Sequence, residues 1–186
     1  MLKTEKENVV FISKYIEVQN NDVVDTNTKN KFKHIKLIEN NTINPGSVVL
    51  CKYNDKFLLL ENYRYGINDF SLELPRGYKN LNESLEDCAR RELKEETDIS
   101  YNLNMDSIHK LGEIAVNSAI LASKVSFFLI TINQSINNLQ LQSDEHIISY
   151  SWIDMNTLLD YVKNGKIIDS FTINALMLYK LKSDCL

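Results

Sequence analysis

The sequence predicts an α/β sandwich with a mixed sheet, preceded by a small antiparallel β-sheet at the N-terminus. Three observations lead to this prediction. Residues 9–39 contain short segments of alternating apolar residues, residues 47–76 have the pattern of strands joined by turns, and the remainder alternates apolar strands with amphipathic helices. Elements in this order pack as helices on both faces of a sheet. We expect an N-terminal β-subdomain at 1–43 and a main domain at 44–186, with the boundary near residues 40–46.

The first expected elements are the strands of the N-terminal subdomain. Their segments are VVFISKYIEV (9–18), DVVDT (22–26) and FKHIKLIE (32–39), and Asn-rich dipeptides at 20–21 and 40–41 are typical of turns between strands. A sheet this small buries little apolar surface by itself, so we expect it to pack against a partner.

The main domain is expected to begin with a β-hairpin. SVVLCKY (47–53) and KFLLLENYR (56–64) flank Asn54–Asp55, a dipeptide typical of a tight hairpin turn. A further strand, FSLELPR (70–76), leads into the acidic stretch that follows, and the loop at 65–69 is expected at the edge of a pocket.

The second half of the main domain predicts three strands and two helices. HKLGEIAV (109–116) and ASKVSFFLITI (122–132) are strands, and the apolar character of the latter on both faces predicts a central position. A polar loop at 133–145 precedes the strand HIISYSWI (146–153). Asp154 is placed to cap a helix that stops at Gly165, and a last helix at 171–182 begins near Asp169 or Ser170.

Composition narrows the class of protein. The chain has 21 basic and 25 acidic residues, a balance that argues against binding to long nucleic acid. Cys51, Cys88 and Cys185 are odd in number and far apart, so they match neither a disulfide framework nor a zinc site. The first residues are polar, and apolar runs fall short of the ~18 residues of a membrane span. We expect a soluble cytoplasmic protein that does not associate with membranes.

The candidate functional residues are concentrated in the acidic stretch GYKNLNESLEDCARRELKEETDI (77–99). On a helix that turns ~100° per residue, Glu92 and Glu96 fall on the same stripe as Ala89 and Leu93. Ionised carboxylates on a core-facing stripe are costly unless they are paired or bind a metal, so this phase favours a divalent cation. The alternative is a solvated charged helix held by ion pairs such as that between Glu86 and Arg90.

The spacing of Gly77, Glu83, the run Arg91–Glu96 and Ile99 resembles the box of the Nudix hydrolases. The resemblance implies a Nudix-type α/β/α sandwich that uses Mg²⁺, with Mn²⁺ as the alternative. It implies that the metal ligands are Glu92, Glu95, Glu96 and the backbone carbonyl of Arg76. It gives structural roles to Gly77, which permits a close backbone turn, and to Glu83 and Arg91, with Arg91 holding Glu83 or Glu95. Asp98 stands where the family usually has Gly, a departure that we expect to cost stability and spare the chemistry.

Residues outside the box resemble the ADP-ribose pyrophosphatase branch of that family. The similar segments are ENYR (61–64), ELPRG (73–77), SDEHI (143–147) and the tail from Gly165 through Leu176. The resemblance implies that Arg64 contacts the diphosphate or the terminal ribose, and that Glu73 assists the metal or the substrate. The candidates for the general base are Glu145, Glu92 and Glu95, with His146 as a runner-up.

Residues 116–124 depart from that branch, because they carry neither its Pro-Gly nor its nearby acid. Lys124 stands near the position of that acid and could face an additional negative charge on the substrate. A sugar nucleotide other than ADP-ribose, or a dinucleotide, therefore stays open.

The resemblance thus implies an enzyme, a Nudix-type pyrophosphatase whose ligand is a small-molecule nucleoside diphosphate derivative. It would hydrolyse, with Mg²⁺, the diphosphate bond of ADP-ribose or a related nucleoside diphosphate sugar, releasing a nucleoside monophosphate and a phosphorylated sugar. The N-terminal strands resemble a sheet that this branch uses for dimerisation, which implies a homodimer. The alternative function is a non-catalytic Nudix-like nucleotide sensor or interaction module.

Overall fold

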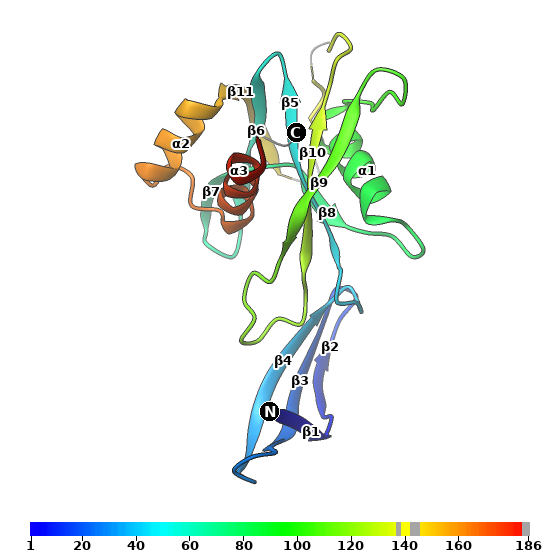
Figure 1. The fold of residues 1–186 in the computed structure, drawn as a ribbon, viewed down its shortest axis with the longest axis vertical. Helices are drawn as coiled ribbons and strands as arrows, with labels where there is room; N and C mark the ends of the chain where they lie inside the picture. Colours follow the sequence, from blue (N-terminus) through cyan, green and yellow to red (C-terminus); the bar gives the residue numbers. More distant parts are fainter. Residues whose placement is uncertain (137–138, 142–145, 184–186) are drawn as a thin grey trace. The chain divides into compact units, whose positions relative to one another are not determined.

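The computed structural model describes residues 1–136, 139–141 and 146–183 (Figure 1). The chain divides into two compact units, Met1–Pro45 with Ala115–Val125, and Gly46–Ile114 with Ser126–Leu186. The first unit thus gains a segment from the middle of the chain. The division of the chain into functional domains at 1–43 and 44–186 stays a prediction.

The first unit is a small antiparallel sheet of four strands. They are β1 (Leu2–Lys6), β2 (Val9–Ile12), β3 (Ile16–Asp25) and β4 (Lys31–Glu39). The long strand β3 pairs antiparallel with each of the other three. Beside β4, the Leu37 N–H donates to the Ile120 carbonyl and the Ala122 N–H donates to the Leu37 carbonyl, which ties the segment 115–125 to this sheet.

Three local predictions for this unit were wrong. The segment predicted at 9–18 is divided at residues 13–15, and its second part continues into the segment predicted at 22–26 as the single strand β3. The polar opening of the chain forms β1, which the sequence did not predict, and Asn20 and Asn21 lie inside β3 and not in a turn. The buried Asn21 is tolerated there because its side-chain oxygen and nitrogen are both hydrogen-bonded. The Asn8 N–H donates to Asn21 Oδ1 over 2.9 Å, and Asn21 Nδ2 donates to Gln19 Oε1 over 2.8 Å.

The second unit is built on one mixed sheet with three helices. Its strands are β5 (Gly46–Tyr53), β6 (Lys56–Arg64), β7 (Asp69–Glu73), β8 (Arg76–Tyr78), β9 (Ser107–Ile114), β10 (Val125–Thr131) and β11 (Ile147–Asp154), and its helices are α1 (Leu85–Thr97), α2 (Met155–Lys163) and α3 (Ser170–Lys182). The strand order is β11-β6-β5-β10-β9, with β7 beside β6 and β8 beside β5. Since β5 and β10 are parallel and β5 and β6 antiparallel, the predicted mixed sheet is confirmed.

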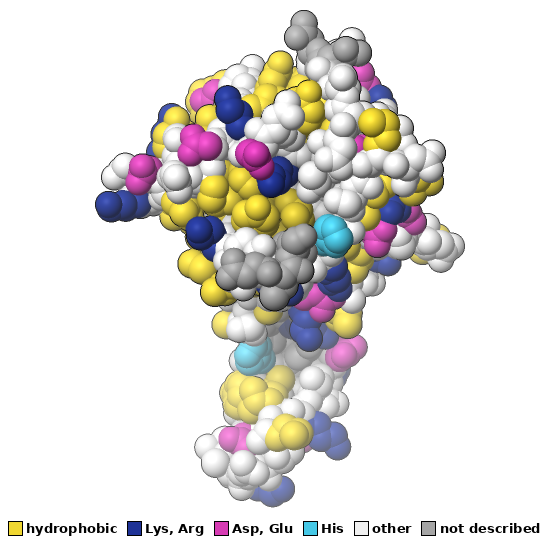
Figure 2. Space-filling model, turned by 45° about the horizontal axis from the view of Figure 1, so that its top comes forward, with side chains coloured by type: hydrophobic (Ala, Val, Ile, Leu, Met, Phe, Trp, Pro, Cys, Tyr) yellow, Lys and Arg dark blue, Asp and Glu magenta, His cyan; other side chains and the backbone are white. Residues whose placement is uncertain are grey.

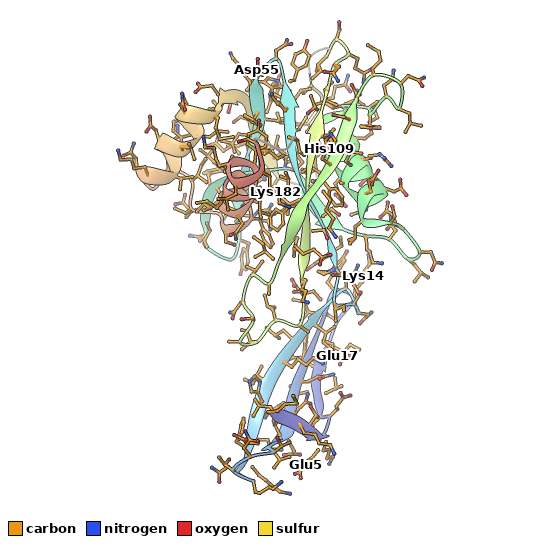
Figure 3. The ribbon with its side chains drawn as sticks, viewed as in Figure 1. Glu5, Lys14, Glu17, Asp55, His109 and Lys182 are labelled. Carbon is orange, nitrogen blue, oxygen red and sulfur yellow. The ribbon has the colours of Figure 1, made fainter. Side chains whose placement is uncertain are left out.

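The hairpin between β5 and β6 opens away from its turn. Asn54 (φ 48°) and Asp55 (φ 58°) are both left-handed, as a type I′ hairpin turn requires, and Asp55 marks the tip in Figure 3. β5 and β6 pair next to this turn. Farther away, β5 pairs with β8 and β6 pairs with β7.

The single strand predicted at 70–76 is broken into β7 and β8. The break falls at Leu74–Pro75, because proline has no amide hydrogen to continue a ladder. The Pro75 carbonyl instead accepts from the Val49 N–H over 2.8 Å. The break directs β7 to one partner strand and β8 to another.

Helices cover both faces of the sheet (Figure 1). Val49 and Cys51 of β5 pack in one buried cluster with Ala89 and Leu93 of α1. Toward α3, the rings of Phe127 and Phe171 lie 6.5 Å apart, and those of Phe57 and Tyr179 lie 5.2 Å apart. β10 is buried from Val125 to Ile130 and lies between β5 and β9, as its composition predicts. The predicted sandwich is confirmed.

Polar caps set the ends of the helices. Asp154 caps α2 and Asp169 caps α3, each by accepting a backbone N–H three residues on, as predicted. α2 ends at Lys163 with Asn164 as its C-cap, and the predicted stop, Gly165, follows with a left-handed φ of 71°. No helix among the described residues is long and apolar enough to cross a membrane.

Asp98 ends α1 in the left-handed region, with φ 64° and its N–H donating to the Lys94 carbonyl. We expect Asp98→Gly to raise the melting temperature by a few degrees, because glycine removes a left-handed penalty of about 1 kcal/mol. The exposed ion pair between Lys94 and Asp98 offsets little of this gain. Differential scanning calorimetry tests it, with Asp98→Asn as the control that loses the ion pair but keeps a tolerant residue. A lower melting temperature for Asp98→Gly would contradict the prediction.

Candidate active site

The acidic helix α1 buries part of its charge. Glu92 is 8% exposed and Glu96 is 6% exposed, on the buried stripe that also holds Ala89 and Leu93, as the helical phase predicts. Glu95 is exposed. The solvated ion pairs of the alternative interpretation are also present, but on the other face, where Arg90 contacts Glu86 and Asp87.

The carboxylate of Glu92 lies directly against the backbone of Gly77. A Cβ placed on Gly77 would come within 2.2–2.3 Å of the Glu92 carboxylate atoms. Gly77 pairs with Ser47 inside β8, and the positive-φ glycines of the chain do not include it. The glycine is therefore required by the close approach of a carboxylate, and the turn expected from the sequence was the wrong reason.

Arg91 gathers the carboxylates of this region. Its guanidinium binds Glu83 in a bidentate manner, at 2.8 and 2.9 Å, and its Nη1 donates to Glu92 and Glu95, each over 2.7 Å. It also donates to the Tyr78 carbonyl over 2.8 Å. The hydrogen bond from Arg91 lowers the pKa of Glu83 below its ordinary value. Where the sequence left Glu83 or Glu95 as partner, the arginine contacts both and Glu92 as well.

The oxygen atoms of the α1 glutamates suit a hard cation, although Glu92 and Glu95 are arranged around Arg91. Among residues 1–136, 139–141 and 146–183, no group of three or more His, Cys, Asp or Glu side chains is arranged to hold a metal ion. Carboxylate and carbonyl oxygens are nevertheless the ligands that Mg²⁺ prefers, and the space left by the missing Cβ of Gly77 holds one of these carboxylates. The chemistry of these residues thus fits Mg²⁺.

The backbone carbonyl of Arg76 lies outside the ladder between β8 and β5. The Pro75 carbonyl accepts from Val49 of β5, and Gly77 pairs with Ser47 of the same strand. Successive carbonyls of a strand point to opposite sides, so the Arg76 carbonyl faces away from β5. It is oriented so that it can accept a further ligand.

A second charged cluster joins β6, β7 and β8. Glu73 is 1% exposed, and Arg64 reaches it from Nη2 over 2.5 Å and Arg76 from Nη2 over 2.7 Å. Burial favours a higher pKa for Glu73, but the hydrogen bonds and charges of the two arginines outweigh it and lower the pKa below 4.5. Hydrogen bonding to Glu73 raises the pKa of Arg64, and the negative charges of Glu96 and Asp169 add to this effect. The cluster therefore lies within electrostatic range of α1.

The sequence predicted Arg64 and Glu73 as separate contacts and assigned Arg76 only a backbone role. The structure joins all three side chains and adds Asp169, whose carboxylate lies 3.7 Å from Arg76. The available signal was the position of Glu73 in the apolar run FSLEL, between two arginines of the segment 64–76.

We expect Glu73→Gln to destabilise the protein by about 1–3 kcal/mol at neutral pH, because two arginines lose their buried partner. The pKa of Glu73 is lowered on folding from its ordinary value of 4.5. Its charge therefore stabilises the fold above that pH, and the contribution is lost as the pH falls through the folded pKa. Urea unfolding of wild type and Glu73→Gln, measured from neutral pH into acid, should show that the difference in their free energy of unfolding becomes smaller as the pH falls.

The control is Glu61→Gln on the same hairpin, since that carboxylate accepts from Ser149 over 2.7 Å and not from an arginine. If the difference between wild type and Glu73→Gln stays constant from neutral pH into acid, the ion-pair account of Glu73 is wrong.

The remaining predicted residues are Lys124, His146 and Glu145. Lys124 belongs to the first unit, where its side chain is exposed and its N–H donates to the Ile43 carbonyl over 2.7 Å. His146 is exposed, and its carbonyl accepts from the Tyr63 N–H. Asp144 and Glu145 lie outside the described residues. The roles assigned to Lys124 and Glu145 stay predictions.

Comparison with known proteins gives two findings. A family model described as the NUDIX domain matches residues 44–171. A solved structure described as a crystal structure of ADP compounds hydrolase is similar in fold, with a TM-score of 0.77 and 16% sequence identity. The match covers 96% of this chain and 92% of that one.

Proposed function

The chain belongs to the Nudix family, and from this premise we propose that it is a Mg²⁺-dependent pyrophosphatase of nucleoside diphosphate derivatives. Its substrate is ADP-ribose or a related nucleoside diphosphate sugar, and its products are a nucleoside monophosphate and a phosphorylated sugar. The observation that carries the proposal is the carboxylate of Glu92, buried on α1 and seated against Gly77 in the space that a Cβ would fill.

Glu92, Glu95, Glu96 and the Arg76 carbonyl would hold Mg²⁺, with Mn²⁺ as a substitute. A cation held by these residues would neutralise negative charge on the diphosphate and make a water molecule more acidic. Arg91 keeps the glutamates together through its contacts with Glu92 and Glu95. Glu83 holds the guanidinium of Arg91 from its other side.

The remaining residues act on the substrate and the water. Arg64 binds the diphosphate or the terminal ribose, Glu73 orients Arg64, and Lys124 faces an additional negative charge on the substrate. The water oxygen forms a bond to phosphorus while the bond from phosphorus to the bridging oxygen breaks. The proton of the water passes to a carboxylate, for which Glu145 is the first candidate and Glu92 and Glu95 are the others.

The name of the similar solved protein, ADP compounds hydrolase, supports an adenosine diphosphate moiety in the substrate. The low sequence identity of 16% leaves the group attached to that diphosphate open. The departure of residues 116–124 from the ADP-ribose pyrophosphatase pattern is the feature of this chain that bears on that group.

A panel of substrates tests the proposal. ADP-ribose, other nucleoside diphosphate sugars and dinucleoside polyphosphates are incubated with the protein and Mg²⁺, and the products are separated by chromatography. We expect a nucleoside monophosphate from at least one member and none when EDTA is added. Tight nucleotide binding by calorimetry with no product from any member would instead favour a nucleotide sensor.

We further propose that the protein is a homodimer formed through its N-terminal strands. The residues of β2, Val9–Ile12, are apolar, and all four are more than half exposed. Figure 2 shows hydrophobic side chains at the surface of the first unit. An exposed apolar strand at the edge of a sheet is a site for pairing with another chain.

We expect light scattering to give the mass of a dimer for wild type and of a monomer for Phe11→Glu, because a charge on β2 opposes burial. Leu81→Glu, at a 93% exposed position of the second unit, is the control and should stay dimeric. A monomeric mass for wild type at micromolar concentration would remove the dimer proposal.

We place the protein in the cytoplasm. The described cysteines Cys51 and Cys88 are free and buried, which suits a reducing compartment. Burial raises the pKa of Cys88 to about 11, so its thiol stays protonated and unreactive.

A further inference from the structure

The N-terminus of α3 packs on the turn that joins β7 to β8. The Leu74 N–H donates to Thr172 Oγ1 over 3.2 Å, and Thr172 Oγ1 donates to Asp169 Oδ2 over 2.8 Å. Leu74 is 1% exposed and Thr172 is fully buried. The backbone of the turn is thus hydrogen-bonded to the first turn of a helix that lies far away in the sequence.

Arg76 makes the second connection between this turn and α3. Its Nη2 donates to Glu73 Oε2 over 2.7 Å, and the same nitrogen lies 3.7 Å from Asp169 Oδ1. Its guanidinium carbon lies 4.3 Å from the centroid of the Phe171 ring, within the range of a cation–π contact. One side chain therefore contacts the strand before the turn and two residues at the start of the helix.

The same turn supplies two elements of the candidate active site. The Arg76 carbonyl faces away from β5, and the next residue, Gly77, lies against the Glu92 carboxylate. A shift of this turn relative to α1 would move both elements at once. The contacts of the Arg76 side chain oppose such a shift.

We propose that Arg76 is a positioning residue. Its guanidinium holds the β7–β8 turn on the N-terminus of α3 and so fixes the Arg76 carbonyl and Gly77 relative to Glu92. The proposal rests on the proposed function, because the proposed function is what assigns the metal-binding carboxylates to α1. It adds that metal affinity depends on α3, an element outside the acidic stretch.

Mn²⁺ binding measured by electron paramagnetic resonance tests the proposal in the full chain. We expect Arg76→Ala to weaken Mn²⁺ binding about 10-fold, the scale of losing a group that orients metal ligands. Arg76→Lys should lie between wild type and Arg76→Ala, since an ammonium keeps the charge but loses the planar fork. Asp169→Asn should also weaken binding, because asparagine keeps the helix cap and removes only the charge facing Arg76.

Arg90→Ala is the matched control. Arg90 also contacts two carboxylates, Glu86 and Asp87, and its guanidinium carbon lies 4.8 Å from the ring centroid of Tyr101. The Arg90→Ala variant loses the same kinds of contact, but on the exposed face of α1. Its melting temperature should therefore fall, while its Mn²⁺ affinity should stay at the wild-type value. A purely stabilising role of Arg76 would make Arg76→Ala behave like Arg90→Ala.

Folded Arg76→Ala with wild-type Mn²⁺ affinity would overturn the proposal, and if that variant does not fold, wild-type affinity in both Arg76→Lys and Asp169→Asn would overturn it. Product formation with unchanged affinity in these variants would refute this inference and leave the proposed function intact. Weakened Mn²⁺ binding in the variants, with no product from any nucleotide, would refute the proposed hydrolysis and support the positioning role.

Discussion

Glu96→Gln and Glu92→Gln should each reduce Mg²⁺-dependent hydrolysis by more than about 100-fold, since loss of an outer-shell partner alone costs about 10- to 100-fold. Both carboxylates are buried on the stripe of α1 that faces the sheet. An ionised carboxylate is costly at such a position unless it is paired or binds a metal ion. Glutamine keeps the shape and removes the charge that attracts a cation. The measurement is kcat/KM on the best substrate of the panel at saturating Mg²⁺.

The matched control for these two variants is Glu86→Gln. Glu86 lies on the exposed face of the same helix and pairs with Arg90, so its loss should leave kcat/KM unchanged. Wild-type activity in both Glu92→Gln and Glu96→Gln would show that the reaction does not depend on these carboxylates.

Gly77→Ala should reduce activity at least about 10-fold and destabilise the protein by about 1–3 kcal/mol. The new methyl group would lie 2.2–2.3 Å from the Glu92 carboxylate, so that the carboxylate or β8 has to move. Either movement displaces a proposed metal ligand. The two measurements are urea unfolding and Mg²⁺-dependent turnover.

Gly66→Ala is the control for this substitution, because a Cβ at Gly66 meets nothing within 4 Å. Its stability and turnover should stay close to those of wild type. Full activity in Gly77→Ala would mean that the contact between Gly77 and Glu92 has no part in the reaction.

Local patterns in the sequence predict much of this fold. The phase of Glu92 and Glu96 on one helix is a property of the backbone alone, and it correctly predicts their burial. The hairpin at Asn54–Asp55 and the caps at Asp154 and Asp169 are likewise decided within a few residues.

Features that depend on distant partners were missed. The strand predicted at 70–76 divides at Leu74–Pro75, and its two halves pair with different strands, β6 and β5. The segment 115–125 joins the first unit through hydrogen bonds to Leu37. Neither partner is visible in the local sequence.

The cluster around Glu73 is the clearest case of this limit. Its members Arg64, Arg76 and Asp169 come from β6, β8 and the cap of α3, and each has an ordinary local role. Only the folded sheet brings their charges together. Resemblance within the acidic stretch could therefore indicate the carboxylates of α1. It could not indicate the charged cluster that contacts the β7–β8 turn.

The central claim is that this chain splits a nucleoside diphosphate derivative with Mg²⁺, and phosphorus NMR of the reaction with ADP-ribose in ¹⁸O-labelled water tests it most directly. We predict that the diphosphate signals give way to those of AMP and ribose phosphate, that one product carries ¹⁸O on phosphorus, and that Glu96→Gln leaves the substrate intact. Unchanged diphosphate signals for wild type, with ADP-ribose and with every other member of the panel, would contradict the claim.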